Sequence, residues 1–533
     1  MATVTSNAAS AAPLSASRRT RSARLIAWLR DVAAAPVLSG VLLTLAFPPL
    51  GWWWAAWAAL VPLYVVLAHG RAGFLRGLLF GLALFLVGMV WMIQIGVVPW
   101  LVLSLIQAGW FALFGAVAAL LLPRLPAAAR PWTFAALWVL SEALRTWGRL
   151  AFPWFPLAVT QVRALPVVQI VAVTGQWGLA FAVVLANGWL GEAWLARRRT
   201  GWTALGFVGA GLALLAALWA GGSVALGRNT VKDESERGFP VRQVAVVQGS
   251  VTPLSNATRD EQRAHFLRSY LDLTREALQD KQMALVTWPE TAIPGTLLGM
   301  DPLMRRAVGD LARSAETPLL AGTVDLDAQR RRSYNGAVLF DGQGTIRARY
   351  HKTQLVPYGE FFPLREFLGP ILTAYGAPDQ DFRHGTLPGV LTTRAVDAPT
   401  ALGALICYES IFGRIARARV RDGAQVLVLL TSDQTFGKTP GGPYQHLDFS
   451  TLRAVETRRY LVRTAATGVS QILDPCGRVK EQLGMNRPGT LTGAVALRDD
   501  QTPFVRWGDW FLSVCGALAV GAVGLAAGRG RRL

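Results

Sequence analysis

Long apolar segments alternate with short loops in the first half of the chain. A helix needs about 20 apolar residues to cross the core of a bilayer, and hydropathy predicts a series of spans near that length. The predicted spans are 33–50, 51–69, 76–97, 100–123, 131–148, 172–195 and 202–226, with an eighth at 508–528. This pattern predicts a multi-span α-helical membrane domain.

Proline interrupts the apolar pattern at two places. Pro48 and Pro49, in FPPLGWWW, predict a tight turn between the first two spans, which are short. The segment 150–170, LAFPWFPLAVTQVRALPVVQI, is aromatic and broken by proline. We therefore expect it to form a loop at the outer membrane interface instead of a span.

Between residues 228 and 507 the pattern changes to short apolar runs separated by amphipathic segments. The apolar runs predict strands at 241–248, 283–288, 318–324, 335–340, 401–407, 425–431, 460–466 and 469–474. The amphipathic segments predict helices at 258–280, 302–314, 410–421 and 444–459. This alternation is typical of an α/β domain, in which helices cover a sheet and chemistry lies at strand ends.

Arginine residues divide the loops between the spans into two classes. The Arg-rich segments contain Arg18, Arg19, Arg21, Arg24 and Arg30, then Arg71 and Arg76, Arg124 and Arg130, Arg197, Arg198 and Arg199, and finally Arg529, Arg531 and Arg532. The alternate loops contain few basic residues, and the positive-inside rule makes the Arg-rich loops cytoplasmic. Both termini are then cytoplasmic, and an odd number of preceding spans puts 228–507 outside.

These patterns together divide the chain into five segments. Residues 1–32 are predicted to form an Arg-rich cytoplasmic tail, and 33–227 a membrane domain of about seven transmembrane helices. Residues 228–507 form an extracytoplasmic domain, 508–528 a final transmembrane helix, and 529–533 a basic cytoplasmic tail.

Composition supports a membrane protein and argues against nucleic-acid binding. The chain is 52% hydrophobic and 16% charged, whereas a soluble domain has about 25% charged residues. The net charge is +20, yet only four acidic residues lie outside 228–507, namely Asp31, Glu142, Glu192 and Asp509. The basic excess therefore belongs to the loops of the apolar part, and no nucleic-acid partner is expected. Three cysteines and five histidines without ligand spacing predict no disulfide scaffold, metal or cofactor.

Three ionisable residues lie at the ends of strand-like runs in the outer domain: Glu290, Lys352 and Cys407. A thiol nucleophile needs a base that accepts its proton and a cation that stabilises the developing oxyanion. Each residue taken alone also has a structural explanation, as a solvated carboxylate, a surface ammonium group or a core cysteine. A Cys407–Cys476 disulfide would be a competing use of the thiol.

Several segments resemble a known family. WPETAIP, HKTQLVPYGEFFPL and ICYESIF are similar to the three active-site segments of the nitrilase (carbon–nitrogen hydrolase) superfamily. LVPYGEFFP, TSDQTFG (431–437) and 446–470, with spans on both flanks, resemble its membrane-embedded branch, the apolipoprotein N-acyltransferases. The resemblance implies that an α/β nitrilase-like domain, an α-β-β-α sandwich, follows the membrane domain.

The resemblance also implies roles for individual residues. Glu290 would be the general base, Lys352 would stabilise the oxyanion and the thiolate, and Cys407 would be the nucleophile. Supporting roles fall on Glu360, Glu409 and Asn335, and the substrate entrance on Tyr408, Phe361 and Pro363. Two departures leave substrate gating open: the 250–260 loop lacks the tryptophan that is common in the family, and TSDQTFG replaces an Asn-Asp-aromatic pattern.

The implied reaction is acyl transfer through a cysteine thioester, from a membrane phospholipid to the N-terminal amine of a diacylglyceryl-modified apolipoprotein. The enzyme would act as a monomer in the bacterial inner membrane, with its catalytic domain on the periplasmic side. One alternative is a membrane-tethered amidase or nitrilase that uses the same triad. Another is a transporter with an exported binding domain. Against it, the spans contain few charged residues of the kind that mark an ion or substrate path, and the best candidates, Glu142 and Arg145, are better explained as an interfacial pair.

Overall fold

The computed structural model describes most of the chain. It covers residues 32–197, 201–228, 234, 237–279, 283–293, 301–327, 332–363, 365, 380–394, 399–437 and 439–530. The predicted N-terminal tail before Val32, Arg198 and Arg199, and the end of the predicted C-terminal tail lie outside these residues.

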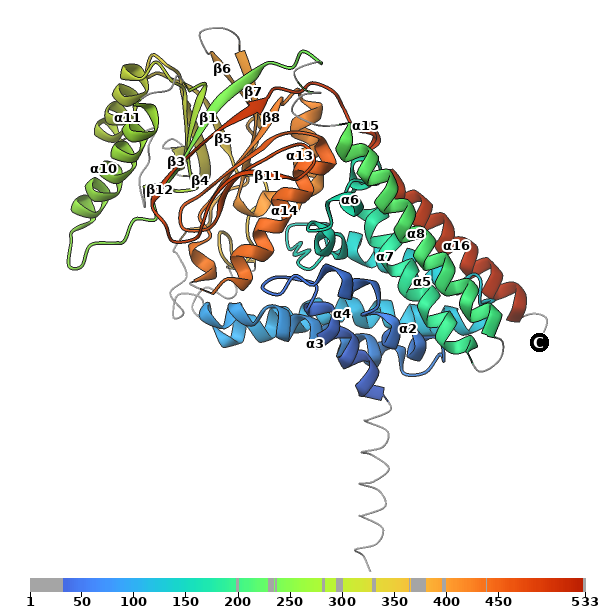
Figure 1. Cartoon of the computed structure of the whole chain (residues 1–533). Helices are drawn as coiled ribbons and strands as arrows, with labels where there is room; N and C mark the ends of the chain where they lie inside the picture. The colour runs from blue at the N-terminus through green and yellow to red at the C-terminus, as the bar shows by residue number, and fades with distance from the viewer. Residues whose placement is uncertain are drawn as a thin grey trace, which may run out of the picture.

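The membrane domain consists of helices joined by short turns (Figure 1). Its elements are a helix at Val32–Thr44, η1 (Trp53–Trp57), α2 (Val61–Leu67), α3 (Gly73–Gly88), η2 (Val90–Gln94), α4 (Val97–Leu121), η3 (Leu122–Arg124), α5 (Arg130–Leu144), η4 (Leu157–Gln161), α6 (Leu165–Val168), α7 (Val171–Ala196) and α8 (Gly201–Gly227). The last helix, α16 (Trp510–Gly530), returns to this domain from the far end of the chain and packs on α5 and α7.

Four helices in the described part of the chain are long and apolar enough to cross a membrane: Val97–Arg124, Val171–Ala196, Gly201–Gly227 and Trp510–Arg529. The other predicted spans are shorter helices. The first ends at Thr44, ahead of the turn that contains Pro48 and Pro49, and the span predicted at 131–148 ends at Leu144. The count of eight spans therefore stays a prediction.

The segment 150–170 forms a loop, as the prolines predict. It contains only the short elements η4 and α6, joined by irregular backbone. Most of its side chains are nevertheless buried, and Trp154 and Leu157 are 3% and 0% exposed. The loop lies between the membrane helices and the α/β domain, so much of its aromatic content packs against protein.

The α/β domain contains twelve strands and four main helices in its described residues. The strands are β1 (Val241–Gln248), β2 (Leu285–Trp288), β3 (Leu319–Asp327), β4 (Arg332–Phe340), β5 (Ile346–His351), β6 (Val390–Arg394), β7 (Pro399–Ile406), β8 (Val426–Thr431), β9 (Leu461–Ala465), β10 (Ser470–Leu473), β11 (Val479–Leu483) and β12 (Gly489–Ala496). The helices are α10 (Arg259–Leu278), α11 (Pro302–Ser314), α13 (Gly413–Arg421) and α14 (Gly441–Thr457), with 3-10 turns η5 (Cys407–Ile411) and η6 (Gln434–Phe436) and the short α15 (Pro503–Trp507).

The strands form two mixed six-stranded sheets with related orders. The first sheet has the order β12-β1-β2-β3-β4-β5, and the second β11-β10-β9-β8-β7-β6. In each sheet the central strands are parallel, β1-β2-β3 in one and β7-β8-β9 in the other, and the outer pairs are antiparallel. Parallel strands that are buried on both faces explain the continuous apolar runs of the sequence.

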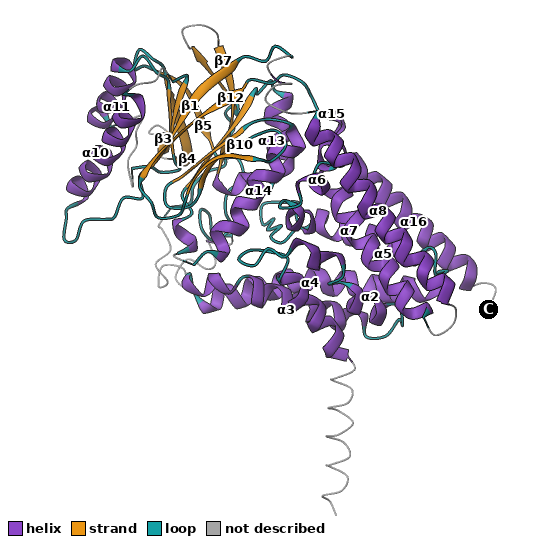
Figure 2. Ribbon diagram, viewed as in Figure 1, coloured by secondary structure: helices purple, strands orange, loops and turns teal. Residues whose placement is uncertain are grey.

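The two sheets face each other and helices cover both outer faces, which gives the expected α-β-β-α sandwich (Figure 2). Val244 and Val246 of β1 point into the core between the sheets, whereas Ala245 and Val247 pack beneath α10 and α11. On the second sheet, Leu405 points outward into a cluster with α13, α14 and the membrane helices. One continuous apolar core therefore joins the two domains.

The predicted strands lack four of the observed ones and misplace one boundary. β5, β6, β11 and β12 are absent from the predicted strands, and β5 corresponds only to the strand-like run before Lys352. β11 (VKEQL) is mostly exposed at a sheet edge, where apolar alternation is not required. The strand predicted to include Cys407 ends at Ile406. The helix predicted at 410–421 is divided into η5 and α13.

Gln445 of α14 connects the α/β domain to the membrane domain through hydrogen bonds. Its Nε2 donates hydrogen bonds to the carbonyl oxygens of Pro48 (2.9 Å) and Gly88 (3.0 Å). Its Oε1 accepts hydrogen bonds from the indole Nε1 atoms of Trp91 (3.0 Å) and Trp154 (2.9 Å). Three separate segments of the membrane domain are thus held by one buried side chain.

Candidate active site

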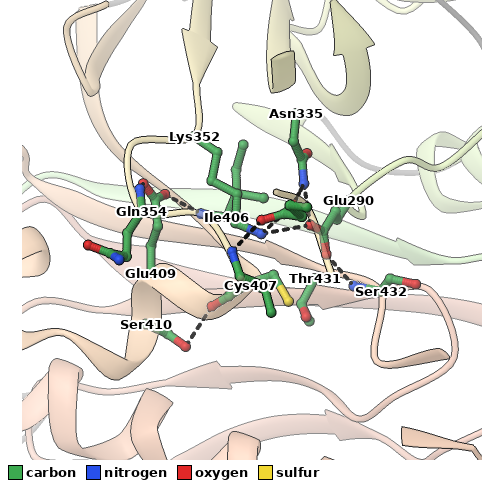
Figure 3. Close-up of polar contacts among 12 residues, drawn as sticks. Glu290, Asn335, Lys352, Gln354, Ile406, Cys407, Glu409, Ser410, Thr431 and Ser432 are labelled. Carbon is green, nitrogen blue, oxygen red and sulfur yellow. Dashed lines mark hydrogen bonds and ion pairs between the residues drawn. The ribbon is translucent and has the colours of Figure 1, made fainter. Parts of the chain in front are cut away.

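The three candidate catalytic residues lie just beyond the ends of three strands and converge between the sheets (Figure 3). Glu290 follows β2, Lys352 follows β5, and Cys407 follows β7. The first two strands belong to one sheet and β7 belongs to the other. Because the two sheets face each other, residues that are far apart in the sequence come together at this place.

A buried network of two carboxylates, one ammonium group and one amide surrounds the site. Lys352 Nζ donates hydrogen bonds to Glu360 Oε1 (2.9 Å) and Glu290 Oε1 (3.2 Å). Asn335 Nδ2 donates to the same two oxygens, at 2.6 Å and 2.7 Å. The second oxygen of Glu290 accepts a hydrogen bond from Ser432 N (3.1 Å). These donors fix the position of the Glu290 carboxylate.

Lys352 carries a positive charge at the base of the site. Its side chain is 1% exposed, and burial by itself would favour the neutral amine. The carboxylates of Glu290 and Glu360 outweigh this cost and raise the pKa of Lys352 well above its ordinary value. The ammonium group is therefore available to stabilise a developing negative charge.

Cys407 occupies a tight backbone turn at the end of β7. Its φ of 48° lies in the left-handed region, which is uncommon for a residue other than glycine and is often found at functional sites. Its carbonyl oxygen accepts a hydrogen bond from Ser410 Oγ (2.9 Å). Burial and the Glu290 carboxylate raise the pKa of the thiol above its ordinary value, although Lys352 opposes the shift. The resting thiol thus keeps its proton at neutral pH.

Glu409 connects the loop that contains Lys352 to the turn that contains Cys407. It is fully buried, and its Oε1 accepts hydrogen bonds from Tyr350 OH (2.6 Å), Thr353 N (2.7 Å) and Thr353 Oγ1 (2.6 Å). Its Oε2 accepts one from Ile406 N (2.8 Å). All the donors described for Glu409 belong to the segments next to Lys352 and Cys407, so the carboxylate connects these segments. This agrees with the supporting role that the resemblance implies.

The sequence analysis assigned no role to a second charged cluster that lies under the nucleophile turn. Asp433 Oδ2 accepts a hydrogen bond from Arg463 NH2 (2.7 Å), and Asp433 Oδ1 lies 2.9 Å from His446 Nδ1. His446 Nε2 lies 3.2 Å from the Cys407 carbonyl oxygen. Burial would raise the pKa of Asp433, but Arg463 and His446 hold it well below its usual range. The cluster supports the backbone of Cys407 from below.

One signal in the sequence points to this cluster. Arg463 interrupts the apolar strand pattern YLVRTAA and is fully buried in β9. An arginine inside a buried strand requires a buried acid. Asp433 meets this requirement, since it follows β8, the strand that pairs with β9.

The predicted entrance residues lie beside the membrane domain. Tyr408 OH donates a hydrogen bond to Ala151 O (2.7 Å), and its ring stacks with Phe152 at 6.2 Å. The guanidinium group of Arg149 lies 5.4 Å from the centre of the Phe361 ring. Pro363 lies next to residues outside the described part of the chain. Their role in substrate entry stays a prediction.

The three cysteines are free thiols. Cys476 is buried elsewhere, with its sulfur 3.3 Å from Arg458 NH1. Cys407 is therefore available for chemistry, and its surroundings match the needs of covalent catalysis. A carboxylate, an ammonium group and a thiol lie close together between the two sheets.

Two family models match consecutive parts of the chain. The apolipoprotein N-acyltransferase N-terminal domain matches residues 39–189, and the carbon-nitrogen hydrolase model matches residues 243–501. The first match falls on the membrane domain and the second on the α/β sandwich.

Curated relatives align with nearly the whole chain. An apolipoprotein N-acyltransferase from Geobacter metallireducens is 33% identical over 91% of this chain and 94% of its own length. One from Methylococcus capsulatus is 32% identical over 92% of this chain and 95% of its own length. Among solved structures, a branch 10 nitrilase-superfamily protein from Saccharomyces cerevisiae, Nit3, covers 48% of this chain at 18% identity with a TM-score of 0.38.

Proposed function

Because this chain belongs to the apolipoprotein N-acyltransferase family, we propose that it transfers an acyl chain from a membrane phospholipid to the N-terminal amine of a lipid-modified apolipoprotein. Glu290, Lys352 and Cys407 are the proposed catalytic residues, and a thioester on Cys407 is the proposed intermediate. The observation that carries the proposal is the convergence of these three side chains at strand ends in a chain of this family.

The first half-reaction loads the enzyme. Glu290 accepts the proton of Cys407, and the sulfur attacks an ester carbonyl carbon of the phospholipid. Lys352 and backbone N–H groups stabilise the oxyanion of the tetrahedral intermediate. The C–O bond then breaks, Glu290 returns its proton to the leaving oxygen, and lysophospholipid departs.

The second half-reaction transfers the acyl chain to the acceptor. The neutral α-amine attacks the thioester carbon, forming a C–N bond while the C–S bond breaks. Glu290 accepts a proton from the nitrogen and passes it to the Cys407 sulfur. The products are an amide and the free thiol, so the enzyme returns to its starting state.

Both substrates are held in a membrane by lipid chains, which explains why the catalytic domain is fastened to membrane helices. The aromatic residues of the 150–170 loop meet Tyr408 next to the nucleophile. This contact offers an apolar route for an acyl chain between bilayer and thiol, and it limits access of water to the thioester.

Mass spectrometry of the full-length protein tests the proposal. After incubation with phosphatidylethanolamine in detergent, the wild-type protein should gain one acyl chain on Cys407, and a diacylglyceryl peptide should then remove it. Cys407→Ala should remain folded and gain no adduct. An adduct on the Cys407→Ala protein would disprove the assignment of the nucleophile.

The same assay separates transfer from hydrolysis. Release of free fatty acid without acylation of the peptide would support the membrane-tethered hydrolase that the triad also permits. Acylated peptide as the main product supports the transferase.

A further inference from the structure

A hollow of about 240 Å³ lies beside the proposed catalytic residues. Its walls are formed by the residues Val251, Phe266, Tyr270, Thr291, Ala292, Ser432, Gln434 and Ala466. These residues come from α10 and from the loops that follow β1, β2, β8 and β9. The hollow therefore opens among the carboxyl ends of parallel strands, where α/β folds place ligands.

Two wall residues connect the hollow to the proposed general base. Thr291 directly follows Glu290, and the backbone N–H of Ser432 donates a hydrogen bond to Glu290 Oε2 (3.1 Å). The hollow therefore borders the Glu290 oxygen that bonds Ser432, whereas Lys352 and Asn335 bond the other oxygen.

The hollow lies between α10 and η6, and η6 contacts the membrane domain. The apolar cluster beneath α10, which includes Phe266 and Tyr270, contains residues of the α/β domain only. On the other wall, Gln434 begins η6, whose Phe436 packs against Trp91 of the membrane domain with ring centres 4.9 Å apart. The hollow therefore extends from the boundary with the membrane domain toward α10.

The lining has the character of a peptide subsite. It combines apolar side chains with Thr291, Ser432 and Gln434, and none of its residues carries a charge. Its volume is about eight times the share of one water molecule in the liquid. The loop after β1 is held in place by Ser250 N, which donates a hydrogen bond to Ala466 O (2.9 Å), so the wall is formed before any ligand binds.

We propose that this hollow binds the first residues after the lipid-modified cysteine of the acceptor, and that it selects small, uncharged ones. The inference rests on the proposed function, because it assigns a place to the second substrate of that reaction. The acyl and glyceryl chains then lie toward the membrane domain. The peptide extends into the hollow, and the attacking amine lies beside Glu290, between the lipid chains and the peptide.

Two substitutions narrow the hollow from different walls, Val251→Phe and Ala466→Leu. Acyl-enzyme is formed first, and its decay is then followed with two acceptors. One is S-dipalmitoylglyceryl-cysteine amide, and the other has the same lipid-modified cysteine followed by Ser-Ser-Asn-Ala. Each substitution should lower the rate with the peptide acceptor, relative to the amide acceptor, by about tenfold.

The control is Leu254→Phe, on the same loop but outside the hollow and 45% exposed. It should keep the wild-type ratio of the two rates. Equal losses with both acceptors, or an unchanged ratio in both narrowed variants, would overturn the subsite. Failure of the proposed function would look different, because no acyl-enzyme would form on Cys407 in any of these proteins.

Discussion

At the scale of single residues, the proposed nucleophile is a neutral thiol, and the charges of the site lie on neighbouring side chains. The Cys407 thiol is protonated at rest because burial and Glu290 disfavour the thiolate. Lys352 stays charged because two carboxylates surround it. A nucleophile that forms only when substrate and base are in place limits side reactions of a thiol in a membrane enzyme.

The raised pKa of Cys407 predicts how the resting enzyme reacts with iodoacetamide. Only the thiolate reacts, and below its pKa the thiolate fraction rises about tenfold for each pH unit. Alkylation of Cys407 should therefore keep rising from pH 7 to beyond the ordinary thiol pKa of about 8.5. The measurement is the rate of mass gain, with Cys407→Ala as the background for Cys476 and Cys515. A rate that levels off below pH 7 would contradict a protonated thiol.

At the scale of elements, α14 connects the nucleophile turn to the membrane helices. Two turns apart, this helix carries His446, which contacts the Cys407 carbonyl, and Arg453, whose NH1 donates to Ile411 O (2.9 Å). Near its end, Glu456 Oε1 accepts a hydrogen bond from Gln176 N (3.0 Å), where α7 is interrupted at Gly175. Displacement of α14 would thus move both the membrane contacts and the catalytic turn.

Gln445→Leu tests this connection. The substitution leaves two indole N–H groups and two carbonyl oxygens without their partner in a buried interface, and each such group costs about 1–3 kcal/mol. We expect the midpoint of thermal unfolding in detergent to fall by several degrees. Tyr444→Phe, one residue earlier on the same helix, should leave the midpoint unchanged. Equal midpoints for Gln445→Leu and wild type would refute the role of Gln445.

At the scale of the whole molecule, the membrane helices attach to one side of the sandwich only. They pack on α13 and α14 and on the loops beside the active site, while α10 and α11 cover the opposite face (Figure 2). This arrangement holds the proposed catalytic residues next to the membrane domain. It is compatible with the orientation that the arginine pattern predicts, with the sandwich outside.

Labelling of introduced cysteines in spheroplasts tests this orientation. Glu276 is exposed on α10, and His69 is exposed at the predicted cytoplasmic end of the span 51–69. A membrane-impermeant maleimide should label the Glu276→Cys protein in intact spheroplasts and the His69→Cys protein only after lysis. Labelling of His69→Cys in intact spheroplasts would show that the predicted topology is inverted.

The sequence analysis predicted the fold class and most of the elements, and the errors have physical causes. Buried strands such as β1 and β8 were found because burial on both faces requires continuous apolar runs. The edge strand β11 was missed because it is mostly exposed and hence free to be polar. Spans near prolines were drawn too long, because hydropathy does not detect where a helix ends in a turn.

The sequence by itself determined that the chain has an apolar helical part and an α/β part, and that Glu290, Lys352 and Cys407 follow strands. It did so because burial and helix or strand periodicity leave local patterns. Only the tertiary structure decided that these side chains meet, since Cys407 stands on a different sheet from the other two. It also revealed the roles of Asp433, Gln445 and the hollow beside Glu290. Each depends on contacts between distant segments, which leave no periodic signal in the sequence.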